Sequence, residues 1–183
     1  MSDDESPLIQ LARQGDPAAC ATLYDRHYDA VYRYCYYHVG DAPLAQDLAG
    51  EVFVRMVENL DRFDVRGRPL LAWLYAIARN LIADTYRKRG QSPQLPLDQV
   101  QVADKDTLAQ RVEQRLLAED LAAALRRLTE EQRQVILLKF VLDHDNAEVA
   151  RMLGKSEGAI KSLQHRALAA LRRALEQGRD HEV

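Results

Sequence analysis

Basic and polar residues recur along the stretch KSEGAIKSLQHRALAALRR, residues 155–173, at a spacing that would let them contact a nucleic acid. On a helix with about 100° per residue, the apolar positions of this stretch share one face and the basic positions lie on the opposite arc. Positive side chains bind phosphates, and the early residues of such a helix can enter the major groove and read base edges. The candidates for contacts at or near base edges are Lys161, Ser162, His165 and Arg166. The candidates for phosphate contacts are Lys155, Arg172 and Arg173.

A helix-turn-helix could hold this stretch against DNA. Asn146 can cap a short helix before it, and Ser156 can cap the final helix, which we expect to end near Leu175. Gly154 lies between the two helices, and glycine tolerates the positive φ of a tight turn. By itself, an amphipathic basic helix more often merely faces water. The capped helix and the turn before it favour DNA binding instead.

A second basic segment spans residues 62–89, with 7 basic and 2 acidic side chains. Pro69 can begin a helix there, and Gly90 can end it. Aromatic residues alternate with Arg and Asn along two flanks of this helix, a pattern that suits the unstacked bases of single-stranded DNA. The first flank holds Trp73, Asn80, Asp84 and Arg87, and the second holds Tyr75, Arg79 and Tyr86. The buried stripe is predicted to be Leu70, Leu74, Ile77, Ala78 and Leu81.

Two residues of the first flank also have a simpler interpretation. Large aromatic side chains dominate core burial, so Trp73 is more often a core residue than a platform for a base. Asp84 is expected to pair with Arg87 or Lys88, at helical spacings of three and four, rather than to face DNA.

The chain as a whole is acidic, with 28 Asp+Glu against 25 Lys+Arg and a formal net charge of -3. Residues 1–61 carry 11 acidic and 4 basic side chains, whereas residues 151–183 carry 7 basic and 4 acidic ones. The negative charge is therefore local, and it does not exclude DNA binding by the basic segments.

Helix signals predict an all-α fold of two small domains. Asp16 and Pro17 can open a helix that runs to about His38 before Gly40. Apolar residues every four positions predict the next helix: Leu44, Leu48, Val52, Met56 and Leu60.

The second half of the chain begins with a predicted linker. Residues 93–107 contain prolines and many polar residues, which indicates a flexible connection between the domains. A helical pattern resumes over residues 108–127, and Thr129 to Gln132 fit a capping box before the apolar run VILLKFVL. We predict a first domain at residues 1–92 and a helix-turn-helix domain at residues 108–183.

Several classes of function are disfavoured. No window approaches the roughly 18 consecutive apolar residues of a membrane span, so we expect a cytoplasmic protein without membrane insertion. Cys20 and Cys35 form no CxxC motif and are expected to be reduced, without a metal. No metalloprotease motif, nucleophile elbow or phosphate loop is present, so we predict neither enzymatic activity nor a cofactor.

Four segments together resemble the extracytoplasmic-function group of bacterial RNA polymerase sigma factors. They are LYDRHYDAVYRYCYYHVGDAPLAQDLAGEVFVRMVENLDRF, WLYAIARNLIADTYRKR, LRRLTEEQRQVILLKF and EVARMLGKSEGAIKSLQHRALAALRR. The resemblance implies a non-catalytic subunit that directs RNA polymerase core to promoters and initiates transcription. It also implies that signals reach the protein through a separate anti-sigma factor.

The resemblance further implies where each partner binds. In such proteins the first domain contacts the clamp helices of the polymerase largest subunit, and its basic helix engages the -10 promoter element. The second domain contacts the flap of the other large subunit and places its last helix on the -35 element. By position, the core-binding candidates are Asp47, Glu51, Val54 and Arg55. The candidates for the -10 element are Trp73, Asn80, Arg87 and Lys88.

Two other interpretations and one departure from the family matter here. A stand-alone DNA-binding regulator would use the same last helix, but it would usually dimerise, and no clear heptad seam is present. An enzyme is disfavoured by the lack of motifs. The pair Leu163-Gln164 replaces the basic and apolar residues usual in the family, so the resemblance does not give the -35 sequence preference.

Overall fold

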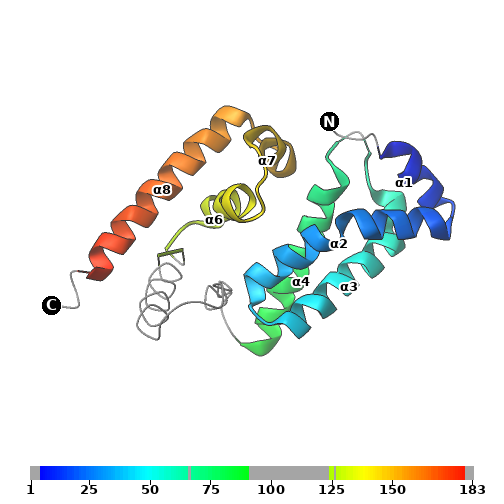
Figure 1. The fold of residues 1–183 in the computed structure, drawn as a ribbon, viewed down its shortest axis with the longest axis horizontal. Coiled ribbons are helices and arrows are strands. Elements are labelled where there is room, and N and C mark those ends of the chain that lie inside the picture. Colours follow the sequence, from blue (N-terminus) through cyan, green and yellow to red (C-terminus); the bar gives the residue numbers. More distant parts are fainter. Residues whose placement is uncertain (1–4, 66, 91–123, 126, 180–183) are drawn as a thin grey trace, which may run out of the picture. The chain divides into compact units, whose positions relative to one another are not determined.

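The computed structural model describes residues 5–65, 67–90, 124–125 and 127–179. All regular elements among these residues are helical, which confirms the predicted all-α class. The described residues form two compact units, whose main parts are residues 5–36 with 41–90 and residues 124–150 with 155–179. Figure 1 labels their helices. The predicted linker at residues 93–107 and most of the helix predicted over 108–127 lie outside the described residues.

Local sequence signals set the ends of the main helices in the first unit. The carboxylate of Asp16 accepts hydrogen bonds from the backbone N–H groups of Ala18 and Ala19, at 2.8 and 3.2 Å. Asp41 caps the next helix in the same way, and Gly90 ends the last one with a φ of 64°. The predicted boundaries are confirmed to within a few residues. The helices are α1 (Ser6–Arg13), α2 (Pro17–Val39), α3 (Ala42–Asn59) and α4 (Leu70–Arg89), with a 3-10 turn, η1, at Leu60–Arg62.

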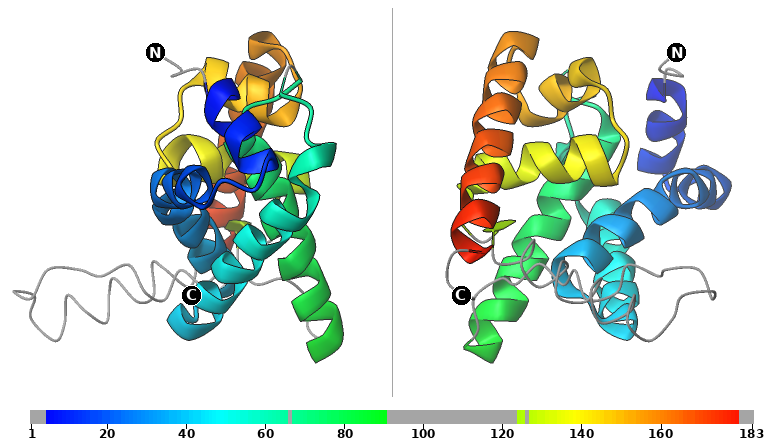
Figure 2. Two further views of the ribbon diagram at one scale, coloured as in Figure 1. Left: turned by 90° about the vertical axis from the view of Figure 1, so that its right-hand side faces the viewer. Right: turned by 60° about the vertical axis from the view of Figure 1, so that its left-hand side comes forward.

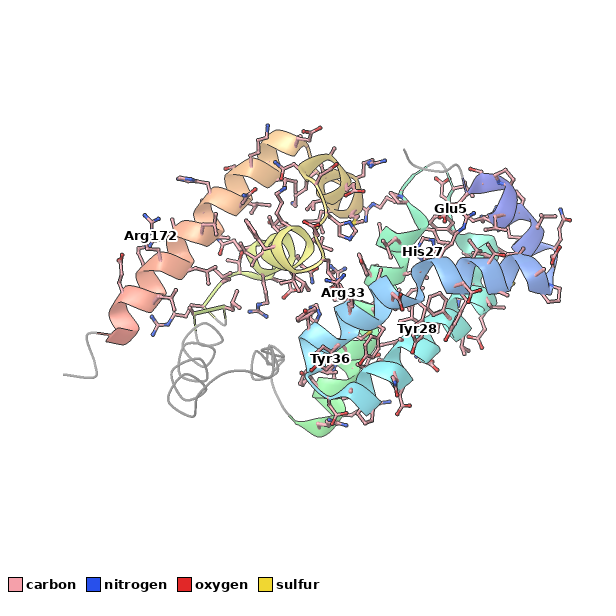
Figure 3. The ribbon with its side chains drawn as sticks, in the orientation of Figure 1. Glu5, His27, Tyr28, Arg33, Tyr36 and Arg172 are labelled. Carbon is pink, nitrogen blue, oxygen red and sulfur yellow. The ribbon has the colours of Figure 1, made fainter. Side chains whose placement is uncertain are left out.

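Helix α1 was not predicted from the sequence. Its Ile9 and Ala12 are buried, and Arg13 donates hydrogen bonds from its guanidinium to the backbone oxygens of Leu60 and Phe63. The carboxylate of Glu5 lies 3.0 Å from Nε2 of His27 on α2 (Figure 3). Polar contacts to residues that are distant in the sequence therefore hold this short helix in place. A local sequence pattern cannot reveal such contacts.

The core of the first unit lies where α2, α3 and α4 pack together (Figure 2). Leu48, Val52 and Met56 of α3 are buried, as the four-residue spacing predicted. The predicted stripe of α4 is also buried, except that Ile77 is only half-buried.

Tyr75 and Tyr86 correct the predicted second flank of α4, because both are buried rather than accessible to bases. The ring of Tyr75 stacks on Tyr34 of α2, with 4.6 Å between the ring centroids. Helix α4 packs against both α2 and α3, so its buried face is wider than the apolar stripe alone indicated. Of this flank, only Arg79 is exposed.

Residues 127–179 contain the predicted helix-turn-helix. Thr129 and Gln132 form the predicted capping box at the start of α6, and Gly154 adopts a φ of 64° in the turn before the last helix. The hydroxyl of Ser156 accepts a hydrogen bond from the backbone N–H of Ala159, at 3.2 Å, and so caps that helix as predicted. The elements are α6 (Glu130–Ile136), a π-helical turn labelled η2 (Leu137–Val141), α7 (Asn146–Leu153) and α8 (Glu157–Arg179).

The cap of α7 lies one residue earlier than predicted. The carboxylate of Asp145 accepts a hydrogen bond from the backbone N–H of Glu148 at 2.8 Å, and the carboxylate of Glu148 accepts one from the N–H of Asp145 at 2.9 Å. This reciprocal pair makes Asp145 the cap. Asn146 is instead the first residue of the helix.

Candidate nucleic-acid interface

Helix α8 has one buried face and one exposed basic face. Ile160, Leu163, Ala167 and Leu171 are buried, and the last two pack with Ile136 of α6. The exposed residues include all the candidates on this helix: Lys161, Ser162, His165, Arg166, Arg172 and Arg173. This is the division that the helical spacing predicted. The apolar face fixes the helix to its domain, which leaves six candidate DNA-contacting residues accessible to solvent.

The long side chains on this exposed face differ in how they are held. Nε of Arg166 donates a hydrogen bond to the backbone oxygen of Ser162, 3.3 Å away, so the guanidinium lies along the first turns of the helix. Arg172 projects from the side of α8 that faces away from α6 (Figure 3). The early and late positions can therefore reach different parts of a bound nucleic acid.

Lys155 is the phosphate candidate that lies before α8. Its Nζ is 2.8 Å from a carboxylate oxygen of Glu131 on α6, and its side chain is 30% exposed. The ion pair links the turn of the helix-turn-helix to the first turn of α6. A phosphate would have to compete with this carboxylate for the lysine.

The candidates on α4 fall into two groups. Asn80, Arg87 and Lys88 are exposed, and Arg87 forms the predicted ion pair with Asp84, at 3.2 Å. Trp73 is half-buried and stacks on the buried ring of Phe63, with 5.0 Å between the centroids. The structure thus gives Trp73 a packing role and leaves part of its ring accessible.

Acidic and apolar residues share the exposed side of α3. Asp47, Glu51 and Val54 are exposed, and Nε of Arg55 lies 2.9 Å from the carboxylate of Glu51. Val54 is 52% exposed and Val57 is 55% exposed. The sequence analysis missed Val57, although its position one residue beyond the buried Met56 marks it as lying outside the apolar stripe.

A row of tyrosines along α2 was also missed. Tyr24, Tyr28, Tyr32 and Tyr36 recur every four residues, and each ring stacks on the next. Tyr24 also packs against Phe53 of α3, with 4.8 Å between the centroids. Burial, together with the neighbouring Tyr24, raises the pKa of Tyr28 above its usual value. Tyr24 and Tyr28 of this row contact Phe53 of α3, and the four-residue repeat was visible in the sequence.

The described residues hold no cluster of three or more potential metal ligands. Both cysteines are free thiols, and burial raises the pKa of Cys35 to about 12, so this thiol stays protonated at neutral pH. Among the described helices, none is long and apolar enough to cross a membrane.

Each of the two units contains a match to a known protein family. Residues 23–92 match the family described as Sigma-70 region 2, and residues 118–171 match the family described as Sigma-70, region 4. The first match contains α3, α4 and most of α2, and the second contains α6, α7 and most of α8. The two candidate DNA-binding helices therefore fall in two different regions of one family.

Individual relatives agree with this assignment. The ECF RNA polymerase sigma factor BldN of Streptomyces coelicolor is 37% identical over 92% of this chain, which spans 64% of that protein. The ECF RNA polymerase sigma factor SigW of Bacillus subtilis is 33% identical, with 91% of this chain and 94% of that protein covered. In a solved structure, CnrH in complex with the cytosolic domain of CnrY, the matched chain has a TM-score of 0.62 and 26% identity, with 96% of this chain and 99% of that chain covered. The chain thus belongs to the extracytoplasmic-function (ECF) sigma factors of bacterial RNA polymerase.

Proposed function

We propose that this sigma factor holds promoter DNA through two helices, with α8 on the -35 element and α4 on the -10 element. The observation that carries the proposal is the exposed basic face of α8. In the sequence, this helix follows a capped helix and a glycine turn. The early residues of α8 would enter the major groove, because that is how a second helix of this motif docks. They are Lys161, Ser162, His165 and Arg166.

The phosphate contacts would come from Lys155, Arg172 and Arg173, which flank the early residues of α8. On α4, Asn80, Arg87 and Lys88 present amide and basic groups to solvent. Positive charge that follows the backbone, together with a partly accessible Trp73, suits the opened strands at the -10 element.

We further propose that α3 docks on the clamp helices of the polymerase largest subunit. Asp47 and Glu51 supply negative charge, and the exposed Val54 and Val57 supply apolar surface beside it. An interface of this kind combines apolar contact with charges that orient the encounter. Arg55 would act mainly by fixing Glu51, with which it is paired. The second domain would contact the flap of the other large subunit.

The proposed domain boundaries are residues 1–92 and 108–183, with a linker at 93–107. The two family matches, residues 23–92 and 118–171, each lie within one of these domains and leave the linker uncovered, which supports the division. We place the protein in the cytoplasm, where core polymerase and chromosomal DNA are found. An anti-sigma factor is the proposed regulator, and the solved complex of CnrH with the cytosolic domain of CnrY supports control through binding of a second protein.

A gel-shift experiment tests whether the protein needs core polymerase to bind promoter DNA specifically. The full-length protein, core polymerase, or both are mixed with a promoter fragment. The proposal predicts a specific complex that forms only when both proteins are present. Tight specific binding to a short -35 duplex by the protein alone, unchanged by core polymerase, would instead indicate a stand-alone regulator.

A further inference from the structure

The ion pair between Glu131 and Lys155 lies at the edge of the proposed DNA-binding face. Lys155 occupies the turn between α7 and α8, where its backbone N–H donates a hydrogen bond to the oxygen of Ala150 at 2.9 Å. Its Nζ lies 2.8 Å from a carboxylate oxygen of Glu131, the second residue of α6. The backbone hydrogen bond fixes the main chain of Lys155, and the carboxylate of Glu131 fixes the position of its ammonium group.

The neighbouring acid makes different contacts. One carboxylate oxygen of Glu130 accepts a hydrogen bond from Nε2 of Gln134 at 3.0 Å, and the other lies 3.6 Å from the guanidinium of Arg133. Both of these partners lie on the same helix as Glu130. Glu130 and Glu131 have similar exposed fractions, 56% and 60%, but only Glu131 reaches across to the turn before α8.

This arrangement has an electrostatic consequence for DNA binding. A phosphate that approaches Lys155 must displace the carboxylate of Glu131 or accept its negative charge nearby. Exposed ion pairs are weak, so displacement is possible, but the lost pair and the nearby repulsion both lower affinity. The counterions that a free lysine would release from DNA are also only partly released.

We propose that Glu131 limits the affinity of the -35 contact by competing with DNA phosphates for Lys155. The inference rests on the proposed contact between α8 and DNA. Because phosphate contacts carry no sequence information, Glu131 lowers binding to all sequences and leaves a larger share of the affinity to the base contacts. Glu131 thus sets the overall strength of DNA binding without touching a base and without changing the preference for one sequence over another.

The test uses the full-length protein assembled with core polymerase and measures its affinity for a promoter fragment and for a scrambled fragment. Glu131→Gln keeps the size and polarity of the side chain but removes its charge. The expected result is a gain in affinity of about two- to fivefold on both fragments at low salt. The fall of affinity with rising salt concentration should become steeper, by at most the amount that about one additional phosphate contact contributes.

Three further variants make the result specific. Glu130→Gln removes a similarly exposed charge next to Glu131 and should change affinity by less than about twofold. Lys155→Gln should weaken binding, and adding Glu131→Gln to it should then have little further effect, because the competing pair is already absent. Thermal unfolding of each variant checks that the domain is folded.

The results that would contradict the inference can be told apart from those that would contradict the proposed contact of α8 with DNA. If Glu131→Gln weakens binding while the domain stays folded, the ion pair positions the turn for DNA and the competition model is wrong. An equal gain with and without Lys155 would mean that Glu131 acts through long-range charge alone, which also overturns the inference. If Arg166→Ala and Lys155→Gln both leave promoter binding unchanged, the proposed contact of α8 fails as well. If those two weaken binding and Glu131→Gln is neutral, only the role of Glu131 fails.

Discussion

Arg166 is the residue whose replacement best separates base reading from phosphate binding. It is exposed on the third turn of α8, at the end of the stretch proposed to contact the groove. Arg166→Ala should reduce the affinity of the polymerase complex for its promoter by about 1–3 kcal/mol and relax the preference at one base pair. Binding to a set of promoters with single substitutions in the -35 element measures both effects.

Arg172→Ala is the matched control for this prediction. Arg172 lies later on the same exposed face, and as a phosphate contact it should weaken binding about equally on every sequence. If Arg166→Ala also behaves in this way, Arg166 contacts a phosphate and reads no base.

Cys35 gives a residue-scale prediction about pH. Its folded-state pKa of about 12 lies above the value near 9 of an accessible thiol, because the side chain is buried. Between these values the unfolded chain releases the proton and the folded chain retains it, so the stability contributed by this group is complete below pH about 9 and is lost as pH rises. The free energy of unfolding should fall by up to about 1.4 kcal/mol per pH unit.

Urea unfolding under reducing conditions, at neutral and alkaline pH, checks this prediction. Cys35→Ala should show a shallower fall of stability above pH about 9, although the change itself lowers stability at every pH. Cys20→Ala is the control, because Cys20 is only half-buried. Identical pH slopes in all three proteins would show that burial of Cys35 does not control its ionisation.

At the scale of elements, the cap of α7 can be tested directly. Asp145→Ala removes the carboxylate that accepts a hydrogen bond from the backbone N–H of Glu148, and should lower the free energy of unfolding of the second unit by about 0.5–2 kcal/mol. Asn146→Ala should cost less, because no hydrogen bond from Asn146 caps the helix. Chemical denaturation of the full-length chain measures both, and a larger cost at Asn146 would contradict the observed cap.

Most helix boundaries of this protein could be predicted from the sequence. Helix ends depend on one or two nearby residues: Asp16 with Pro17, the capping box from Thr129, and Gly90 each act within a few positions of the boundary. Asp145 and Asn146 are adjacent residues of similar capping ability, but Glu148 stands three residues after Asp145 and completes a capping box with it. This signature was visible in the sequence, and the sequence analysis overlooked it.

Packing between elements was much less accessible to prediction. Tyr75 looked like an exposed aromatic because its flank also carries Arg79, yet it is covered by Tyr34 from a helix about 40 positions away in the sequence. Helix α1 depends on Arg13 reaching Leu60 and Phe63. The basic face of α8 was predicted well because a single helix defines it, whereas the pairing of Lys155 with Glu131 joins two elements.

At the scale of the whole molecule, the acidic side of α3 should govern assembly with polymerase. Asp47→Asn with Glu51→Gln removes two exposed charges and should weaken binding to core polymerase by about tenfold, mainly through a slower association rate. The effect should shrink at high salt, because screening reduces attraction between exposed charges. Association rates at two salt concentrations provide the measurement.

Asp25→Asn with Asp29→Asn is the matched control, since it removes two exposed charges from α2. These residues lie outside the proposed docking face, so the change should be much smaller. Equal losses in both double variants would mean that only the overall charge of the domain matters, and α3 would lose its special role.

Transcription in vitro tests the central claim most directly, namely that the chain selects promoters for polymerase through two DNA contacts. Purified core polymerase and the full-length protein are incubated with a genomic DNA library, and the start sites are mapped. We predict new start sites that share a -10 and a -35 sequence at constant spacing, with the -35 preference relaxed for Arg166→Ala. Start sites that are the same with and without the protein, or that share no upstream sequence, would contradict the account.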